Sequence, residues 1–393
     1  MKNLFCRSLA LAALLASVAG CRTTGQHEGG RAGIVLDSLY ARYAAPKTKL
    51  LRENYPDDTP YEATYLAETA AGNAYSYLWP FSGTLSAAAA LVEARGWETY
   101  GPLIDTAVLP GLEEYADYER VPFAYSSYIG SAPASDRFYD DNIWLGIDFA
   151  DLYAASRQPR FLEGAEAIWR FVESGTDERL GDGIYWCEQR KESKHACSNA
   201  PGAVLALKLY AATGDEAYLE RGRALYAWTR TELLDPEDDL YYDNIRLDRT
   251  LGKAKFSYNS GQMIQAGALL HRLTGEKHYL EEARRTALSC LEHFFETVET
   301  PEGDSIRLLR GDMIWFDAVM LRGMAELARE DATTDYLTPF GQSLDYAWEH
   351  ARDEQGLLGD WKGAKRDARK WLLSQAAFAE MLARMDAMTN VEK

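Results

Sequence analysis

The sequence predicts an all-α protein in which six inner helices are enclosed by six outer helices, an (α/α)6 toroid. Three observations support this fold class: an internal repeat near sixty residues, helical hydrophobic spacing around each repeat marker, and long connections on one side only. The 393 residues are 47% hydrophobic and 12% aromatic, a composition typical of a globular protein. An open solenoid of helical hairpins is the competing prediction from the same pattern.

The repeat is marked by an aromatic residue that closely follows a tight turn. Thr213-Gly214-Asp215 precedes one such aromatic residue, and Thr274-Gly275-Glu276 precedes the next. A glycine at this point caps the preceding helix, and the acidic residue begins the following one. The markers are spaced by 61, 57, 61 and 57 residues, and they are Tyr100, Phe161, Tyr218, Tyr279 and Tyr336.

Two helices flank each marker. The helix before the marker is rich in alanine, glycine and aliphatic residues, whereas the helix after it has the three-to-four apolar spacing of a half-exposed helix. The inner helices are expected at residues 73–93, 142–155, 200–212, 261–273, 313–328 and 371–385. The outer helices are expected at residues 33–51, 100–115, 161–173, 217–231, 279–295 and 336–351. Strand patterns are scarce.

The connections between these helices are short on the marker side and long on the opposite side. The long ones are expected at residues 116–139, 175–198, 232–258, 297–312 and 352–370. Long loops on one face of a rigid scaffold usually carry binding or catalytic residues. Because each of them leads into an inner helix, the N-terminal rim of the inner helices is the predicted functional face.

The N-terminus has the pattern of a secretion signal. Residues 1–20 combine a basic start with a short apolar run, and they end in a Val-Ala-Gly-Cys sequence that resembles a bacterial lipobox. The resemblance implies lipidation of Cys21. The Thr- and Gly-rich composition of residues 21–32 predicts a flexible tether, and the helical repeat places one domain at residues 33–393. We therefore expect a cell-envelope lipoprotein, periplasmic or anchored to the outer membrane. An ordinary signal peptide cleaved near the same place is the alternative.

Charge and cysteine content limit the partners. Sixty Asp and Glu against forty-two Lys and Arg give a net charge of −18, which argues against nucleic acid. The lipid is the only expected membrane contact, and we expect a monomer. Cys187 and Cys197 lie ten residues apart and either form a disulfide or stay free, while Cys290 stands alone. Their spacing is not that of a zinc site, so no metal and no cofactor is predicted.

The adjacent carboxylates Asp140 and Asp141 are the most specific feature of the predicted rim. Glycoside hydrolysis requires two carboxyl groups that flank one bond. Repulsion between two close carboxylates raises one pKa, which suits one group to donate a proton and the other to attack. The alternative is that either residue merely caps the helix.

Further acidic, amide and aromatic residues recur where inner helices begin, as expected for a carbohydrate cleft. Trp144 fits the cleft and the core equally well, Trp315 favours the core, and rings in loops fit either place. His195, without a neighbouring serine-nucleophile motif, is expected at the surface. The predicted substrate-binding residues are Trp79, Tyr139, Asn142, Trp144, Tyr185, Trp186, Asn199, Asp243, Asn244, Tyr258, Asn259 and Trp315.

The segment Tyr139-Asp140-Asp141-Asn142-Ile143-Trp144 resembles the Asp-Asp-Asn-Ala-Trp signature of glycoside hydrolase family 76, the endo-α-1,6-mannanases. Three further stretches agree in order and spacing, and they begin at Cys197, Ser257 and Trp315. The resemblance implies an (α/α)6 fold, a retaining mechanism and a mannan or mannooligosaccharide substrate. It implies Asp140 as the nucleophile and Asp141 as the general acid/base, with Asp243, Asn244 and Asn259 at subsites.

Two departures from the family pattern are visible: Ile143 replaces a common alanine, and the Cys187–Cys197 pair leaves the shape of its loop open. Two other functions also fit a toroid. One is a glycosidase or lyase acting on a different glycan. The other is a glycan-binding lipoprotein without catalytic activity, against which the intact aspartate pair argues.

Overall fold

The computed structural model describes residues 29–57, 73–311 and 313–390. The expected signal peptide at residues 1–20 and the expected lipidation site Cys21 lie outside these ranges. The first helix, α1 (Gly30–Tyr43), begins inside the expected tether and ends well before residue 51, where the sequence placed its end. No described helix has the length and apolar character needed to cross a membrane.

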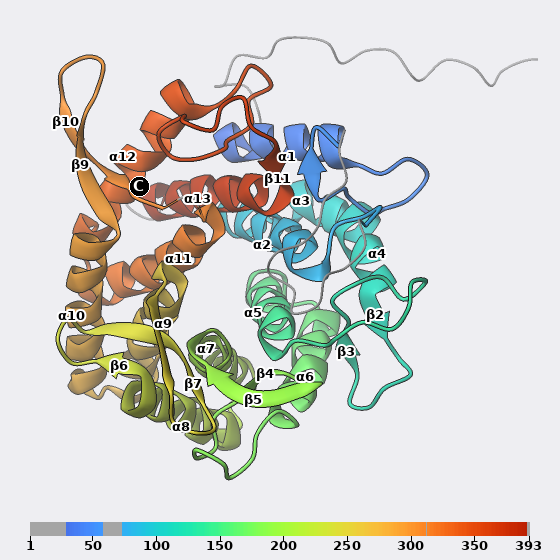
Figure 1. Cartoon of the computed structure of the whole chain (residues 1–393), viewed down its shortest axis with the longest axis vertical. Coiled ribbons are helices and arrows are strands. Elements are labelled where there is room, and N and C mark those ends of the chain that lie inside the picture. Colours follow the sequence, from blue (N-terminus) through green and yellow to red (C-terminus); the bar gives the residue numbers. More distant parts are fainter. Residues whose placement is uncertain (1–28, 58–72, 312, 391–393) are drawn as a thin grey trace, which may run out of the picture.

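Six helices form a closed inner ring (Figure 1). Each packs against the next, and the last packs against the first, so the toroid prediction is confirmed and the open solenoid is excluded. The predicted inner helices are present, with boundaries shifted by a few residues. They are α2 (Leu78–Arg95), α5 (Tyr139–Ser156), α7 (Ala196–Thr213), α9 (Ser257–Thr274), α11 (Ile314–Asp331) and α13 (Leu372–Asn390).

The outer layer is formed by α1 together with five further helical segments, which alternate with the inner helices along the chain. Two of these segments are irregular where the sequence predicts one continuous helix. Pro102 lies inside the first of them, where its ring removes a backbone donor, and a π-helical turn follows at Ile104–Val108. The outer segments are α3 (Trp97–Leu103) continuing into α4 (Leu109–Leu112), α6 (Pro159–Glu173), α8 (Glu216–Leu233), α10 (Lys277–His293) and α12 (Thr338–Tyr346).

Short turns join each inner helix except α13 to the following outer segment. Gly214 and Gly275 end α7 and α9 in the left-handed conformation, with φ of 74° and 75°, as the repeated Thr-Gly-acid pattern predicts. Arg157 and Ala332 adopt the same conformation after α5 and α11. The tight-turn side of the ring is therefore regular, and the elaboration lies on the opposite side.

The long connections are richer in strands than the sequence suggested. Five strands from two successive connections form one antiparallel sheet in the order β4-β5-β7-β6, with β8 beside β7. They are β4 (Tyr185–Cys187), β5 (Arg190–His195), β6 (Leu234–Asp235), β7 (Leu240–Arg246) and β8 (Leu251–Lys255). The remaining pairs are β1 (Asn54–Tyr55) with β11 (Lys370–Trp371), β2 (Ala116–Asp117) with β3 (Ala124–Tyr125), and β9 (Phe295–Glu299) with β10 (Ser305–Leu309).

Two kinds of contact hold the inner helices together. α9 and α11 approach at Gly261 and Gly323, where an added Cβ on Gly323 would collide with the carbonyl oxygen of Gly261. Deeper in the ring, Arg322 of α11 donates from Nε and Nη2 to Glu380 of α13, at 2.6 and 2.9 Å. Asp148 of α5 lies 3.6 Å from the same guanidinium. Three inner helices therefore share one buried charged cluster.

Candidate active site

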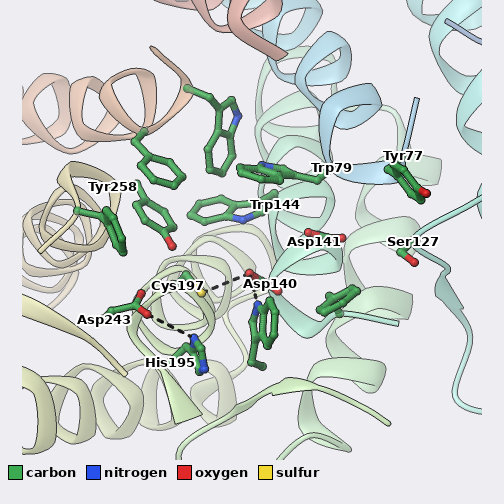
Figure 2. A pocket seen from close by; sticks show the side chains of 15 residues that line it. Tyr77, Trp79, Ser127, Asp140, Asp141, Trp144, His195, Cys197, Asp243 and Tyr258 are labelled. Carbon is green, nitrogen blue, oxygen red and sulfur yellow. Dashed lines mark hydrogen bonds and ion pairs between the residues drawn. The ribbon is translucent and has the colours of Figure 1, made fainter. Parts of the chain in front are cut away.

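A cavity of about 280 Å³ opens at the N-terminal rim of the inner helices, the face that the loop pattern predicts (Figure 2). Aromatic rings line one part of it and carboxyl groups another. Its lining comprises Tyr77, Trp79, Ser127, Phe138, Asp140, Asp141, Trp144, Trp186, His195, Cys197, Asp243, Phe256, Tyr258, Trp315 and Phe316.

The helices place their side chains in this cavity by a simple rule. The second residue of every inner helix except α13 lines the cavity, because all these helices present their first turns to the ring axis at the same level. These five residues are Trp79, Asp140, Cys197, Tyr258 and Trp315. The site is therefore assembled by the repeat itself, with a different side chain supplied at each equivalent position.

Asp140 is held by donors from two other elements. Its Oδ2 accepts a hydrogen bond from Trp186 Nε1 at 3.1 Å and from Cys197 Sγ at 3.3 Å. Burial raises the pKa of Asp140 to about 7, while the two hydrogen bonds favour the ionised form. This carboxyl group consequently changes its charge near neutral pH.

Asp141 lies beside Asp140 on the cavity wall, as Figure 2 shows. Burial raises its pKa well above the ordinary value, and the charge of Asp140 raises it further. Because the two carboxyl groups repel each other when both are charged, ionisation of one favours the protonated form of the other, and the hydrogen bonds from Trp186 and Cys197 favour ionisation of Asp140. One acid and one carboxylate side by side are the requirement for double displacement at a glycosidic carbon.

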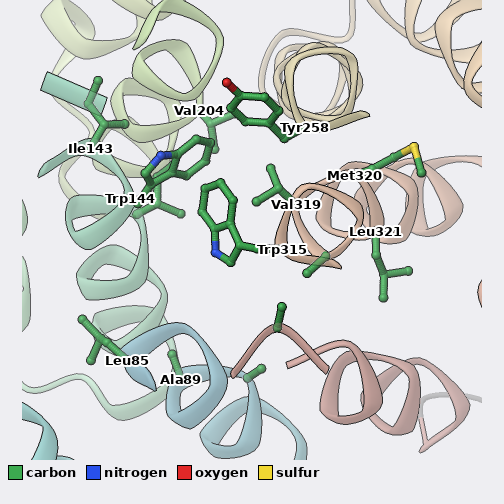
Figure 3. Close-up of a cluster of buried hydrophobic side chains, with 14 of the residues drawn as sticks. Leu85, Ala89, Ile143, Trp144, Val204, Tyr258, Trp315, Val319, Met320 and Leu321 are labelled. Atoms are coloured by element: carbon green, nitrogen blue, oxygen red, sulfur yellow. The ribbon is translucent and has the colours of Figure 1, made fainter. Parts of the chain in front are cut away.

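The aromatic wall faces this pair. Tyr258 stacks on Phe316 with ring centroids 4.0 Å apart and an angle of 12°. Trp315 meets both Trp79 and Trp144 edge to face, at 5.3 and 5.1 Å. Figure 3 shows Trp144, Tyr258 and Trp315 within the cluster of buried hydrophobic side chains, so Trp144 and Trp315 belong to the cavity and the core together.

The opposite wall combines Asp243 of β7 with His195 of β5. Their side chains are 3.9 Å apart, and the His195 ring stacks on Trp186 at 5.1 Å with an angle of 16°. Burial lowers the pKa of His195 to about 4, although the charge of Asp243 acts in the opposite direction, so the ring is neutral at pH 7. The expectation that His195 lies at the surface is wrong, because the pairing of β5 with β7 brings it into the cavity.

Two predicted amides hold loops in place and do not line the cavity. Asn142 is fully buried, accepts from the Tyr125 N–H at 2.7 Å and donates to the Tyr125 carbonyl at 3.0 Å. Asn199 forms the same pair of bonds with Ile184, at 2.6 and 2.9 Å. Both occupy the fourth position of an inner helix and anchor the backbone of the preceding connection.

Four other predicted residues also lie outside the cavity lining. Tyr139 is fully buried and stacks on Phe171 of the outer helix at 4.6 Å, because the first residue of α5 faces outward from the ring. Tyr185 is likewise buried, and its hydroxyl donates to Asp177. Asn244 and Asn259 donate to Asp243, at 2.7 and 3.4 Å, and so orient a carboxylate that does line the cavity.

The remaining predicted binding residues line the cavity, together with seven others that sequence reasoning did not assign to it. Cys197 and Phe316 occupy helix positions equivalent to predicted ones, so the repeat register would have found them. Tyr77, Phe138, His195 and Phe256 each immediately precede an inner helix, so the same register would have found them too. Only Ser127 lies in a connection away from a helix start, where no local pattern marks it. The seven are Tyr77, Ser127, Phe138, His195, Cys197, Phe256 and Phe316.

The three described cysteines, Cys187, Cys197 and Cys290, are free thiols, so the two open alternatives for the Cys187 loop resolve in favour of unpaired residues. Among the residues that the structure describes, no group of three or more His, Cys, Asp or Glu side chains is arranged to hold a metal ion.

A closed ring of helical pairs, with adjacent carboxyl groups and aromatic rings in a cavity at one rim, defines the class of (α/α)6 carbohydrate-active proteins. Residues 36–391 match the model of glycosyl hydrolase family 76, and the chain belongs to this family.

Solved structures of this family have the same fold. The glycoside hydrolase family 76 mannosidase Bt3792 of Bacteroides thetaiotaomicron is 31% identical, with 94% of this chain and 100% of that one aligned and a TM-score of 0.84. The α-1,6-mannanase GH76A of Salegentibacter sp., solved as an inactive variant with α-1,6-mannotriose, is 25% identical over 92% of this chain and 100% of that one, with a TM-score of 0.72.

A curated relative is the mannan endo-1,6-alpha-mannosidase DCW1 of Candida glabrata. It is 26% identical over 196 residues, which are 45% of this chain and 41% of that protein. The chain thus aligns with less than half the length of the curated relatives that it matches.

Proposed function

We propose that this protein hydrolyses α-1,6-linked mannan or mannooligosaccharides with retention of configuration. The observation that carries the proposal is the pair Asp140–Asp141 on one cavity wall, where hydrogen bonds favour the ionised form of Asp140 and the charge of Asp140 favours the protonated form of Asp141. Trp79 and Phe316, both partly exposed in the cavity, supply apolar faces on which a sugar ring packs.

The proposed reaction has two steps. Asp140 attacks the anomeric carbon, the bond from that carbon to the glycosidic oxygen breaks, and Asp141 transfers its proton to the departing oxygen. Asp141, now ionised, takes a proton from water, and the hydroxide displaces Asp140 from the same carbon. Each aspartate returns to its starting state, and the two inversions leave the product with the original anomeric configuration.

The substrate class is supported by the relatives. The Salegentibacter protein is described as an α-1,6-mannanase, and its inactive variants carry substitutions of two consecutive aspartates. The present chain carries consecutive aspartates in the first turn of an inner helix. Asp243 adds an acceptor of the kind that binds sugar hydroxyl groups, and its orientation is fixed by two asparagines.

The experiment is hydrolysis of defined α-1,6-mannooligosaccharides by the wild-type protein and by the variants D140A and D141A. We expect kcat/KM to fall by about 10,000-fold in each variant, because a reacting group is lost. Proton NMR of the first product should show the α-anomer if the configuration is retained. Unchanged rates in either variant, or an initial β-anomer, would contradict the proposal.

Asp215 provides the matched control. It is an exposed aspartate at the start of α8, where its carboxylate accepts from the Ala217 N–H at 3.0 Å. Asparagine caps a helix equally well, so D215N should keep both the fold and the activity. A panel of other α- and β-linked glycans, including uronic-acid polymers, tests the substrate class.

We further propose that the protein is a lipoprotein of the cell envelope, attached through Cys21, on the strength of the signal pattern in residues 1–21. Cells that express the full chain should incorporate labelled fatty acid into it and retain it with the membrane fraction. C21A should remove both the label and the membrane association. Labelling that persists in C21A would contradict this assignment.

A further inference from the structure

The proposed nucleophile is contacted by a thiol. Cys197 is the second residue of α7, is 3% exposed and lines the cavity, with its Sγ 3.3 Å from Asp140 Oδ2. Trp186 of β4 donates to the same oxygen atom from a different element. Three segments, β4, α5 and α7, therefore meet at one carboxylate oxygen, as Figure 2 shows.

The thiol keeps its proton in this place. Burial raises the pKa of Cys197 well above its ordinary value, and the neighbouring carboxylates Asp140 and Asp243 raise it further. An S–H group is a weak donor toward a neutral acceptor, but a hydrogen bond to an ionised carboxylate is markedly stronger. The same surroundings make Cys197 a poor nucleophile, since the reactive form of cysteine is the thiolate.

We propose that Cys197 is a positioning residue of the reaction: its S–H group, together with the Trp186 indole, fixes the orientation of the Asp140 carboxylate and favours its ionised form. The inference rests on the proposed function, in which Asp140 is the nucleophile. A hydrogen bond to the charged form of an acid stabilises that form. Loss of the thiol should therefore raise the pKa of Asp140 and leave more of it protonated at neutral pH.

Three substitutions separate donation from packing. C197A removes the donor and leaves space, C197V removes the donor and fills most of the space, and C197S keeps a donor. We expect kcat/KM at pH 7 to fall about tenfold in C197A and C197V, as for the loss of a hydrogen bond to a charged group. The acidic limb of the pH profile should move up by about one unit. C197S should restore the position of that limb.

Cys290 supplies the matched control, because it is equally buried but lies on the outer helix α10, outside the cavity lining. C290A should leave the pH profile in place. If C197A and C197V keep the wild-type acidic limb while remaining folded, or if C197S shifts it as far as C197A does, the positioning role is wrong.

A direct titration separates this inference from the proposed function. Aspartate carboxyl carbons are labelled with ¹³C, the Asp140 signal is identified from its loss in D140N, and its titration is followed in the wild type and in C197A. A higher midpoint in C197A supports the role of Cys197 even if no mannooligosaccharide is hydrolysed. An unchanged midpoint overturns it even if the protein is fully active.

The state of the thiol is a second check. Mass spectrometry after alkylation of the unfolded, unreduced protein should find Cys187 and Cys197 both modified, as expected for free thiols. Detection of a Cys187–Cys197 disulfide in active protein would overturn the inference, because no S–H group would then be present to donate.

Discussion

The adjacent aspartates show how two residues of the same type acquire different states from their surroundings. Asp140 is contacted by two donors that stabilise its negative charge, whereas Asp141 faces the charge of Asp140. The sequence supplied the pair and the family resemblance supplied the roles. The donor Trp186 lies on β4 and the donor Cys197 on α7, and spacing along the chain does not reveal that both meet Asp140.

The pH dependence of activity follows from these states. Asp140 has a pKa raised to about 7 by burial, so kcat/KM should rise with pH as this group ionises near neutrality. Burial and the charge of Asp140 raise the pKa of Asp141 well above its ordinary value, so activity should fall at the alkaline end of the profile, where Asp141 loses its proton. A bell-shaped profile measured on a mannooligosaccharide checks this. An acidic limb near pH 4 would show that Asp140 is not perturbed in this way.

Asn142 was predicted to bind substrate, whereas its amide anchors a loop outside the cavity lining. Its amide is bonded to both polar groups of the Tyr125 backbone, inside the protein. N142A should lower the free energy of unfolding by about 2–4 kcal/mol, because two buried backbone groups lose their partner. Urea unfolding measures this. The partly exposed Asn244, bonded to Asp243, is the comparison: N244A should cost less than about 1 kcal/mol. Equal losses would argue against the anchoring role.

At the scale of the element, two positions in the first turn of the inner helices have different roles. The second residue faces the cavity in five of the six helices, and the fourth residue anchors the preceding loop in four of the six: Asn142, Asn199, Ser260 and Gln375. The sequence shows that polar and aromatic residues recur at the helix starts. It does not separate the two positions, since that requires the helix phase relative to the ring axis.

The close approach of α9 and α11 is a second property of the elements. G323A should destabilise the protein by about 3 kcal/mol, because the added methyl group meets backbone atoms of Gly261 that side-chain movement cannot clear. Thermal or urea unfolding checks this value. G341A, on the outer helix α12 with only a flexible methionine near its Cβ site, should be neutral or slightly stabilising. Similar losses in both variants would show that helix packing is not the cause.

For the whole molecule, the sequence predicts that the ring of helices closes, but it does not predict the strands that the long connections form at its rim. The regular spacing of Tyr100, Phe161 and Tyr218 predicts the helical pairs, since each pair must bury an equivalent apolar face against its neighbours. The five-stranded sheet joins two connections about fifty residues apart through β5 and β7. Pairing of this kind is non-local, and the short strands have little periodicity of their own.

The charged cluster of Arg322, Glu380 and Asp148 joins three inner helices. Burial raises the pKa of Glu380, but Arg322 and Arg384 outweigh it and lower that pKa to about 2. The stability that this group contributes is thus present above its ordinary pKa of 4.5 and is lost as the pH falls toward 2.

R322M should lower the free energy of unfolding at pH 7 by about 3–5 kcal/mol, because Glu380 keeps its charge in the interior with only Arg384 beside it. Urea unfolding measures the loss. The double variant R322M/E380L should recover part of it, since both charges are then removed. A double variant with the summed loss of the two single variants would contradict this account.

Four connections are anchored by the fourth residue of the inner helix that follows them, and this has a consequence for diversification. A connection anchored in this way can be exchanged for one of different length, provided that the anchoring asparagine, serine or glutamine is kept. The two connections that share the five-stranded sheet must be exchanged together. Relatives with this ring of helices should thus differ in glycan preference mainly through these connections. Chimaeras in which connections are exchanged between relatives should therefore have altered glycan selectivity.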